Sequence, residues 1–184
     1  MIQTIKYPAV NEALADHIEE LLVSLNFPWY YIPNAAWKPQ PGEIVDDMLF
    51  SFSHSFHDVY KNSFTAEYAF HALNVLYEIA SKRNHIIKEV SRFRAFMQTP
   101  SRNPGTMHGI HTDQNQPHLV CIYYSNDADG DTVFFDNNNK EIFRNTPKKN
   151  TAVIFDGSIP HSAETPSKRR AILNFNYLIT NEVF

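Results

Sequence analysis

The sequence is poor in cysteine and has no long hydrophobic run. Its single cysteine, Cys121, excludes a disulfide bond within the chain, which is typical of proteins in a reducing compartment. No apolar run approaches the length of a membrane-spanning helix, and residues 1–8 lack the apolar core of a signal peptide. We therefore expect a soluble, cytoplasmic protein with no membrane partner.

The chain also lacks an excess of basic residues. It has 16 Lys and Arg against 20 Asp and Glu, which gives a formal net charge of −4. Proteins that bind nucleic acid over a broad surface usually carry a basic stripe, so such a footprint is not indicated. Small basic clusters at Arg92 and Arg94, at 148–149 and at 168–169 leave a local nucleic-acid groove open.

What is present favours one sheet-rich domain. The 184 residues are enough to bury a sizeable core, and 14 Phe with 9 Tyr are typical of a sheet interior. The sequence contains no internal repeat and no sign of a domain boundary. We expect a single domain over 1–184, with a helix-containing part at 1–90 and a strand-rich core at 91–180.

Two amphipathic helices are predicted in the first part of the chain. Apolar residues recur at helical spacing over 10–25, and Pro28 ends this helix. A second apolar stripe runs over 66–80, with Ser63 as a fair N-cap. We expect both helices to pack on the outer face of a sheet.

Most of the remaining chain has the patterns of strands and turns. Predicted strands cover 29–32, 48–56, 92–97, 117–125, 132–136, 141–144, 151–155 and 170–179, with a short edge strand at 2–7. The segments 34–47 and 99–106 are predicted loops, and three asparagines at 137–139 predict a hairpin turn. Segment 34–47 is either an ordered cover over a cavity or an ordinary surface excursion. Helices followed by a long series of strands indicate an α+β domain.

Three residues in the last third of the chain have the chemistry of a metal site. His111 and Asp113 form an H-x-D step, in which residues two apart in an extended chain face the same side. His161 follows an apolar run at 153–155 and a glycine-bearing turn at 156–158. Two imidazoles and one carboxylate suit Fe(II) and leave coordination positions open. The alternatives are a chance H-x-D step and an ordinary core or surface histidine.

Arg170 lies nine positions after His161 and opens a predicted buried strand. A guanidinium in that place is costly unless it meets an anion, and its planar fork matches a carboxylate through two parallel hydrogen bonds. The spacing therefore indicates a site for an acidic co-substrate. The alternative is a solvated basic turn at 168–170.

Two neighbouring residues compete for these roles. His108 lies three residues before His111, but the residue two positions after it is Ile110 rather than a carboxylate. Arg169 could replace Arg170 as the partner of the co-substrate, but adjacent residues in a strand point to opposite faces. We therefore expect His111 rather than His108 to bind the metal, and Arg170 rather than Arg169 to bind the co-substrate.

Several motifs between roughly 105 and 180 occur together. They are HGIHTD at 108–113, CIYYSN at 121–126, a Gly-Asp-Thr step at 130–132, Pro-His at 160–161 and KRRAILNFNY at 168–177. In this combination the chain resembles the 2-oxoglutarate and Fe(II)-dependent oxygenases of the prolyl-hydroxylase-like branch. Within that branch it is similar to small proteins encoded by bacteriophages, especially those of marine cyanobacteria. The resemblance implies a double-stranded β-helix (jelly-roll) barrel, with the metal inside one open end and two helices outside.

The resemblance also implies the roles of individual residues. The implied Fe(II) ligands are His111, Asp113 and His161. 2-Oxoglutarate would chelate that iron, and its far carboxylate would pair with Arg170 and accept the hydroxyl of Tyr124. Strand alternation places Tyr123 on the opposite face as a packing residue. An apolar wall that would exclude water is offered by Ile122, Phe134, Phe155 and Ile172.

The implied activity is that of a dioxygenase. It would consume O2 and 2-oxoglutarate, release succinate and CO2, and hydroxylate a C–H bond of its substrate. The branch favours a prolyl or other protein side chain, while nucleic acid and small molecules stay open, as does the oligomeric state. A phage protein would act in the host cytoplasm. The alternatives are a cupin-like barrel that binds a metal or ligand without oxygenase activity, and an interaction domain without turnover.

Overall fold

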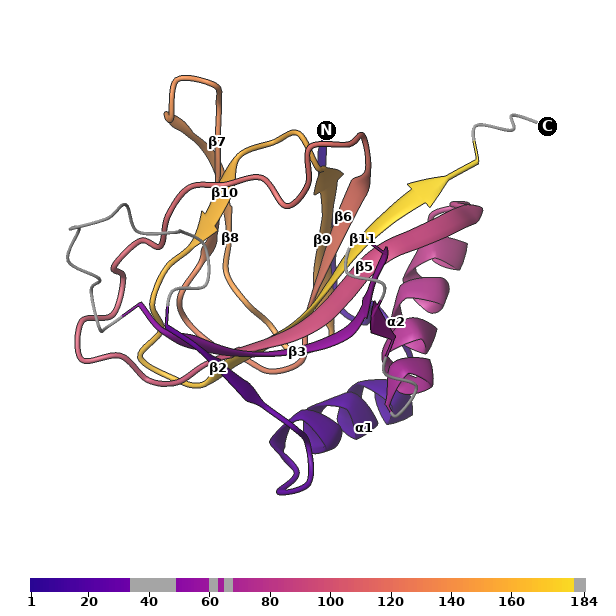
Figure 1. Cartoon of the computed structure of the whole chain (residues 1–184), viewed down its shortest axis with the longest axis horizontal. Coiled ribbons are helices and arrows are strands. Elements are labelled where there is room, and N and C mark those ends of the chain that lie inside the picture. The colour runs from indigo at the N-terminus through magenta and orange to yellow at the C-terminus, as the bar shows by residue number, and fades with distance from the viewer. Residues whose placement is uncertain (34–48, 60–62, 65–67, 181–184) are drawn as a thin grey trace.

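The computed structural model describes residues 1–33, 49–59, 63–64 and 68–180. This part of the chain forms two antiparallel β-sheets and two helices (Figure 1). The predicted loop at 34–47 lies outside the described residues. Among the residues that the structure does describe, no helix is both long enough and apolar enough to cross a membrane.

The larger sheet is antiparallel and contains most of the strands. Its order is β1 (Ile2–Ile5), β9 (Thr151–Asp156), β6 (Leu119–Tyr124), β11 (Arg170–Ile179), β5 (Ile87–Gln98), β3 (Ser51–Asp58) and β2 (Tyr30–Ile32), and β4 (Ser63–Phe64) also pairs with β3. The smaller sheet has the order β10 (His161–Ala163), β7 (Thr132–Phe135) and β8 (Glu141–Asn145). Most of the predicted strands are therefore present, with bounds shifted by a few residues.

Strand alternation divides the interior of the molecule into two cores. On β6, Cys121 and Tyr123 pack in the core that includes the helices, whereas Ile122 and Tyr124 pack in the core that includes β7. The two faces of one strand thus serve the two cores, as the period of two requires. Tyr123 is a buried packing residue on the face opposite Tyr124, as predicted.

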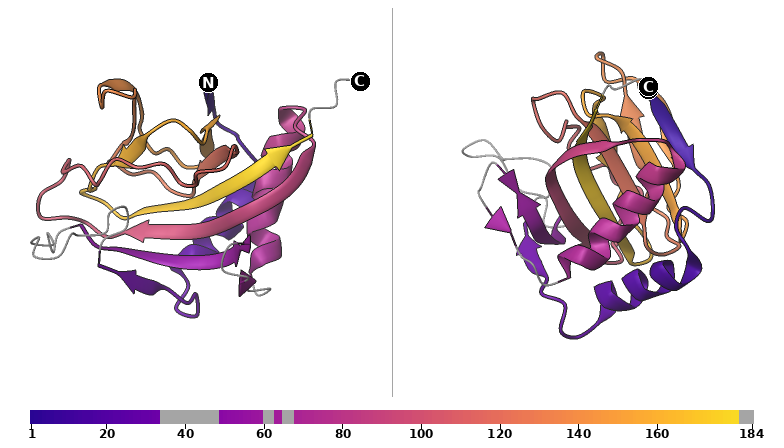
Figure 2. Two further views of the ribbon diagram at one scale, coloured as in Figure 1. Left: turned by 45° about the horizontal axis from the view of Figure 1, so that its top comes forward. Right: turned by 90° about the vertical axis from the view of Figure 1, so that its right-hand side faces the viewer.

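Two helices cover the outer face of the larger sheet (Figures 1 and 2). Helix α1 (Glu12–Val23) begins after Asn11, whose side chain accepts a 2.9 Å hydrogen bond from the Leu14 backbone N–H. Helix α2 (Ala69–Lys82) presents a buried apolar stripe to the sheet: Ala69, Ala72, Val75, Leu76, Ile79 and Ala80. Both helices therefore stabilise the sheet from the side opposite the smaller sheet.

One predicted feature was wrong, and one strand was missed. Ser63 is not a helix N-cap, because it lies in the short strand β4, and α2 begins only at Ala69. The residue before that helix, Tyr68, has a left-handed backbone with φ of 66° and no capping hydrogen bond from its side chain. Strand β10 was not predicted, because three residues after a proline are too few for alternation to be seen.

The hairpin turn at 137–139 is present between β7 and β8. Asn139 has φ of 60°, in the left-handed region that asparagine tolerates better than most residues. Its backbone N–H donates to the Asp136 carbonyl, and the Asp136 N–H donates to the Lys140 carbonyl, so the turn is closed by its own backbone. This turn returns the chain into the smaller sheet, which faces the larger one across the second core.

Candidate active site

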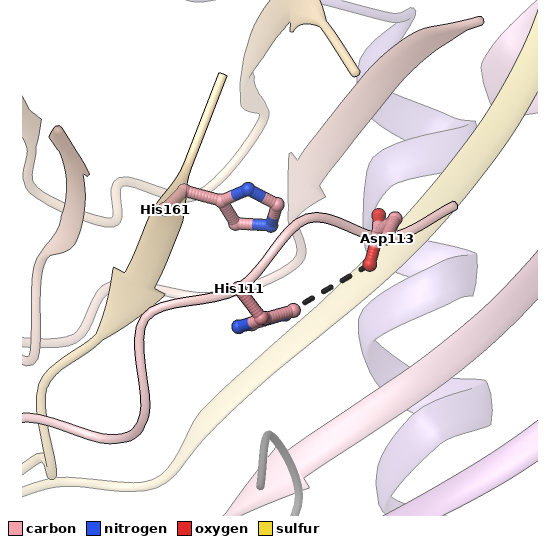
Figure 3. A group of neighbouring side chains, drawn as sticks. All are labelled: His111, Asp113 and His161. Atoms are coloured by element: carbon pink, nitrogen blue, oxygen red, sulfur yellow. Dashed lines mark ion pairs between the residues drawn. The ribbon is translucent and has the colours of Figure 1, made fainter. Parts of the chain in front are cut away.

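The three predicted metal ligands lie together between the two sheets (Figure 3). His111 and His161 are joined by a two-bond backbone bridge, in which each N–H donates to the other residue's carbonyl at 3.0 and 2.9 Å. The bridge attaches the segment that carries Asp113 to β10 of the smaller sheet. His111 and Asp113 do not lie in a regular strand, which differs from the predicted strand end.

The ligand atoms of this group have the spacing of a single-ion site. One imidazole nitrogen from each histidine and one carboxylate oxygen all lie within 4.8 Å of one another. The His111 Nε2 atom is 3.9 Å from the Asp113 Oδ1 atom. His161 is buried and 7% of the Asp113 side chain is exposed, whereas 32% of the His111 side chain is exposed. The group therefore has a buried side and an open side.

Hydrogen bonds fix the same tautomer in both histidines. The Nδ1 atom of His111 lies 3.0 Å from the Gly109 carbonyl oxygen, and Nδ1 of His161 lies 3.2 Å from the Ile159 carbonyl oxygen. A carbonyl only accepts, so each Nδ1 carries the proton and each Nε2 keeps its lone pair. Burial lowers the pKa of His161 to about 4, so its ring is neutral at pH 7 and can bind a metal.

Asp113 is held as a carboxylate by three polar neighbours. Its Oδ1 atom lies 3.0 Å from Arg92 Nη2, and its Oδ2 atom accepts hydrogen bonds from the side-chain amides of Asn174 at 3.1 Å and Asn176 at 2.8 Å. Burial opposes ionisation, yet the pKa of Asp113 lies far below its ordinary value because His161, Arg92 and Asn176 stabilise the charge. Two Nε2 lone pairs and one ionised carboxylate fit an Fe(II) ion.

Arg170 lies in the same cavity and is 4% exposed. Its Nη1 donates to Gln98 Oε1 at 3.0 Å, and its Nη2 donates to Thr132 Oγ1 at 2.8 Å. Within the described residues, its Nε has no hydrogen-bond partner and no carboxylate forms an ion pair with it. Burial lowers the pKa of Arg170, which shows how unfavourable this charge is without an anion.

The tyrosine hydroxyl that was predicted to reach the co-substrate lies close to Arg170. The Arg170 guanidinium carbon is 5.8 Å from the centre of the Tyr124 ring, and the Tyr124 hydroxyl donates to Thr132 Oγ1 at 2.9 Å. Thr132 and Gln98 were not predicted as site residues. The only feature of the sequence that could have indicated Gln98 is its spacing of two from the inward-facing residues of its strand.

Neither of the two competing residues takes the place that it competed for. Arg169 is 43% exposed at the surface, where its Nη2 atom is 3.8 Å from Glu19 Oε1. His108 lines the cavity but is not part of the three-ligand group, and its Nε2 atom is 2.6 Å from Gln98 Nε2. The structure therefore brings together the residues that the sequence favoured over these two.

One cavity of about 240 Å³ contains both the three-ligand group and Arg170. Ile122 and Ile172 of the predicted apolar wall line it. Phe134 and Phe155 instead pack against the His161 ring, with ring centres 6.2 and 4.8 Å away. A larger hollow of about 720 Å³, near the start of α1, contains none of the predicted site residues.

Residues 96–178 match the family model described as the 2OG-Fe(II) oxygenase superfamily. The matched segment includes His111, Asp113, His161 and Arg170. Fe(II) and 2-oxoglutarate, with O2, are the cofactors of the superfamily. No curated protein matches the chain in sequence.

Solved structures show the same fold. A 2OG-Fe(II) oxygenase family oxidoreductase from Burkholderia pseudomallei has a TM-score of 0.68 at 11% identity, over 96% of this chain and 84% of that one. A prolyl hydroxylase from Trichoplax adhaerens, in complex with a hypoxia-inducible factor peptide fragment, has a TM-score of 0.65 at 13% identity. The match covers 96% of this chain and 83% of that one. The viral collagen prolyl hydroxylase vCPH from Paramecium Bursaria Chlorella virus-1 has a TM-score of 0.55 at 15% identity. The match covers 96% of this chain and 94% of that one. At these identities the likeness shows the fold alone, and it confirms the predicted jelly-roll architecture.

Proposed function

We propose that this protein is an Fe(II)- and 2-oxoglutarate-dependent dioxygenase that hydroxylates its substrate. One observation supports this most strongly: a two-histidine, one-carboxylate group shares a cavity with a buried arginine that has no carboxylate partner among the described residues. A metal and an anion with a carboxylate at its far end would satisfy both features at once. 2-Oxoglutarate is such an anion.

In this proposal the iron ligands are Nε2 of His111, Nε2 of His161 and one oxygen of Asp113. The backbone bridge sets the separation of the two rings, and Asn174 and Asn176 orient the carboxylate before any metal arrives. When bound, Fe(II) and 2-oxoglutarate would supply the chemistry of O2 activation, with one oxygen atom going to succinate as CO2 is released and the other to the substrate. The protein's own contribution is to hold three ligands on one side of the ion and leave the other side open.

The far carboxylate of 2-oxoglutarate would bind Arg170 through its unpartnered Nε and the adjacent Nη. Thr132 and Gln98 hold the other donors of the guanidinium, so its orientation is set in advance. Tyr124 would reach the same carboxylate by turning its hydroxyl away from Thr132. Ile122 and Ile172 line the space between and exclude water from it.

The substrate that we favour is a prolyl or other side chain of a protein. Support comes from similar structures, which include a prolyl hydroxylase in complex with a peptide and a collagen prolyl hydroxylase. The cupin-like alternative, a metal-binding barrel without oxygenase chemistry, gives no reason for a buried Arg170 that lacks an anion. A phage origin stays a prediction from the sequence.

The test is anaerobic addition of Fe(II) and 2-oxoglutarate to the purified protein. We expect the visible metal-to-ligand charge-transfer band of a bidentate chelate, which His161→Ala should abolish because an iron ligand is lost. Arg170→Ala should raise the 2-oxoglutarate concentration needed by about ten-fold or more, the effect of losing a charged hydrogen-bonding partner. Arg169→Ala is the matched control and should leave the titration unchanged, since that side chain lies at the surface. A metal-loaded protein without the band would reject the proposal.

A further inference from the structure

Four alternate residues of β5 line the cavity: Arg92, Arg94, Phe96 and Gln98. In the sheet register, Gln98 lies opposite Arg170 on β11, and Arg94 lies opposite Asn174. Asn174 is hydrogen-bonded to Asp113. Gln98 therefore marks the co-substrate end of this strand, and Arg94 marks the metal end, where the substrate has to react.

Neither the metal site nor the co-substrate site accounts for Arg94. Arg92, its neighbour on the same face, is engaged twice, by Asp113 at 3.0 Å and by Asn176 Oδ1, which accepts a hydrogen bond from Arg92 Nε at 2.9 Å. With the described residues, the Arg94 side chain makes one polar contact, in which Nη2 lies 3.2 Å from Asp58 Oδ2. A guanidinium has five N–H donors, so most of those on Arg94 are not engaged by a described residue.

Exposure leaves Arg94 reachable from the cavity. Its side chain is 21% exposed, whereas the Asp58 side chain that it contacts is 3% exposed. Asp58 is therefore the more deeply buried of the two partners, and the Arg94 side chain lines the cavity. A planar fork held on one side and free on the other is suited to receive a carboxylate.

The charges around the cavity also favour an anion. Among the described residues, the charged side chains lining it are Arg92, Arg94, Arg170 and Asp113, and Asp58 contacts Arg94. These are three positive charges against two negative ones. An Fe(II) ion and the 2-oxoglutarate dianion cancel each other, so the loaded site would keep one positive charge in excess. Burial and then the nearby charge of Arg92 lower the pKa of Arg94, and the carboxylates of Asp58 and Asp113 offset only part of this effect.

We propose that the substrate carries a carboxylate, and that Arg94 binds this group beside the metal. The inference rests on the proposed oxygenase function and narrows its substrate class to acids. The carboxylate can be that of a free organic or amino acid, or that of an acidic side chain next to the target residue in a peptide. Arg94 then determines specificity, because a neutral substrate would leave its donors and its charge without a partner.

The test uses protein loaded with Mn(II) and saturating 2-oxoglutarate, with trifluoroacetate as the anion probe. Paramagnetic relaxation of the fluorine signal reports binding close to the metal, without any turnover. We expect saturable relaxation with trifluoroacetate and none with the neutral trifluoroacetamide. Arg94→Gln should weaken binding of the anion by about ten-fold or more, as for other charged hydrogen bonds. Arg169→Gln, the matched surface control, should bind the probe like the wild type.

A second variant distinguishes the loss of a binding group from the loss of the fold. Asp58→Asn removes the internal carboxylate that engages Arg94, so it should increase the affinity for trifluoroacetate. A gain of affinity cannot come from a damaged fold. Equal relaxation in wild type and Arg94→Gln, equal relaxation with the neutral probe, or no binding of the anion to wild type would each overturn the proposal.

Competition against bound trifluoroacetate then distinguishes the two sources of the carboxylate. L-Proline and L-glutamate carry a free α-carboxylate, while a peptide amide with one internal glutamate carries it on a side chain. Displacement by L-proline but not by L-prolinamide would support a free acid, and displacement by the acidic peptide would support a peptide. Equal displacement by prolinamide would contradict the role of charge. Failure of the proposed function is seen separately, as a missing charge-transfer band with Fe(II).

Discussion

Thr132 connects the two residues that we propose hold the co-substrate. Its hydroxyl oxygen accepts hydrogen bonds from Arg170 Nη2 at 2.8 Å and from the Tyr124 hydroxyl at 2.9 Å. All three side chains are buried, so a lost partner would not be replaced by bulk water. The orientation of the guanidinium therefore depends on a residue that was not predicted to be part of the site.

Thr132→Val keeps the approximate shape of this side chain and removes its oxygen. We expect the 2-oxoglutarate concentration for half-maximal charge-transfer absorbance to rise about ten-fold, because a buried donor of Arg170 loses its acceptor. Tyr123→Phe is the matched control, since that hydroxyl lies on the other face of β6 and has no partner among the described residues. An unchanged titration in Thr132→Val would exclude this supporting role.

At the scale of elements, helix α2 supports the sheet without contributing to the cavity. Its buried stripe packs in the outer core together with Phe93 and Phe175 of β5 and β11, while the cavity lies on the opposite face of those strands. Loss of packing at the helix should therefore affect the stability of the fold much more than the geometry of the metal site.

Leu76→Ala tests this separation of roles. Leu76 is completely buried, so the variant should lower the free energy of unfolding by about 2–5 kcal/mol, through lost burial and an unfilled cavity. Phe70→Ala on the same helix is the control, and because Phe70 is 73% exposed it should change stability by less than about 0.5 kcal/mol. Urea unfolding measures both values. The folded Leu76→Ala protein should keep the charge-transfer band, and loss of that band would show coupling between helix and site.

The helices and strands were predictable where their patterns were long. The amphipathic stripes of α1 and α2, the alternation of β5 and the continuous apolar run of β6 were sufficient for their identification. Ser63 misled the prediction because a good capping residue precedes the helical stripe, yet it pairs with β3 in a two-residue strand. The strand β10 exists because His161 pairs with Phe134 and bridges His111, and no local pattern encodes these long-range contacts.

At the scale of the whole molecule, the buried site links stability to pH. Burial lowers the pKa of His161 from 6.5 to about 4, so between these values the unfolded chain binds a proton that the folded protein does not. Stability therefore rises with pH across this interval and is lost as the pH falls. The depressed pKa of Asp113 acts in the same direction at lower pH, because its carboxylate stabilises the fold only while ionised.

Metal-free protein should accordingly lose stability when the pH is lowered from about 6.5 to about 4. The contribution of His161 is at most about 3 kcal/mol, since one pKa unit corresponds to about 1.4 kcal/mol. Urea unfolding at a series of pH values, with a chelator present, measures this dependence. His161→Gln removes the titrating group and should flatten the curve over the same interval. Parallel curves for the two proteins would contradict the assignment to His161.

The sequence by itself was enough to predict the ligand types that we propose, and the resemblance carried by its motifs predicted the architecture. The H-x-D step, the later histidine and the arginine at the head of the last strand suffice, because metal and carboxylate chemistry restrict the residue types that can serve. Only the tertiary structure decided how these residues are supported. The backbone bridge between His111 and His161, the amides on Asp113 and the hydroxyl that orients Arg170 come from segments far apart in the chain, and only the folded structure brings them together.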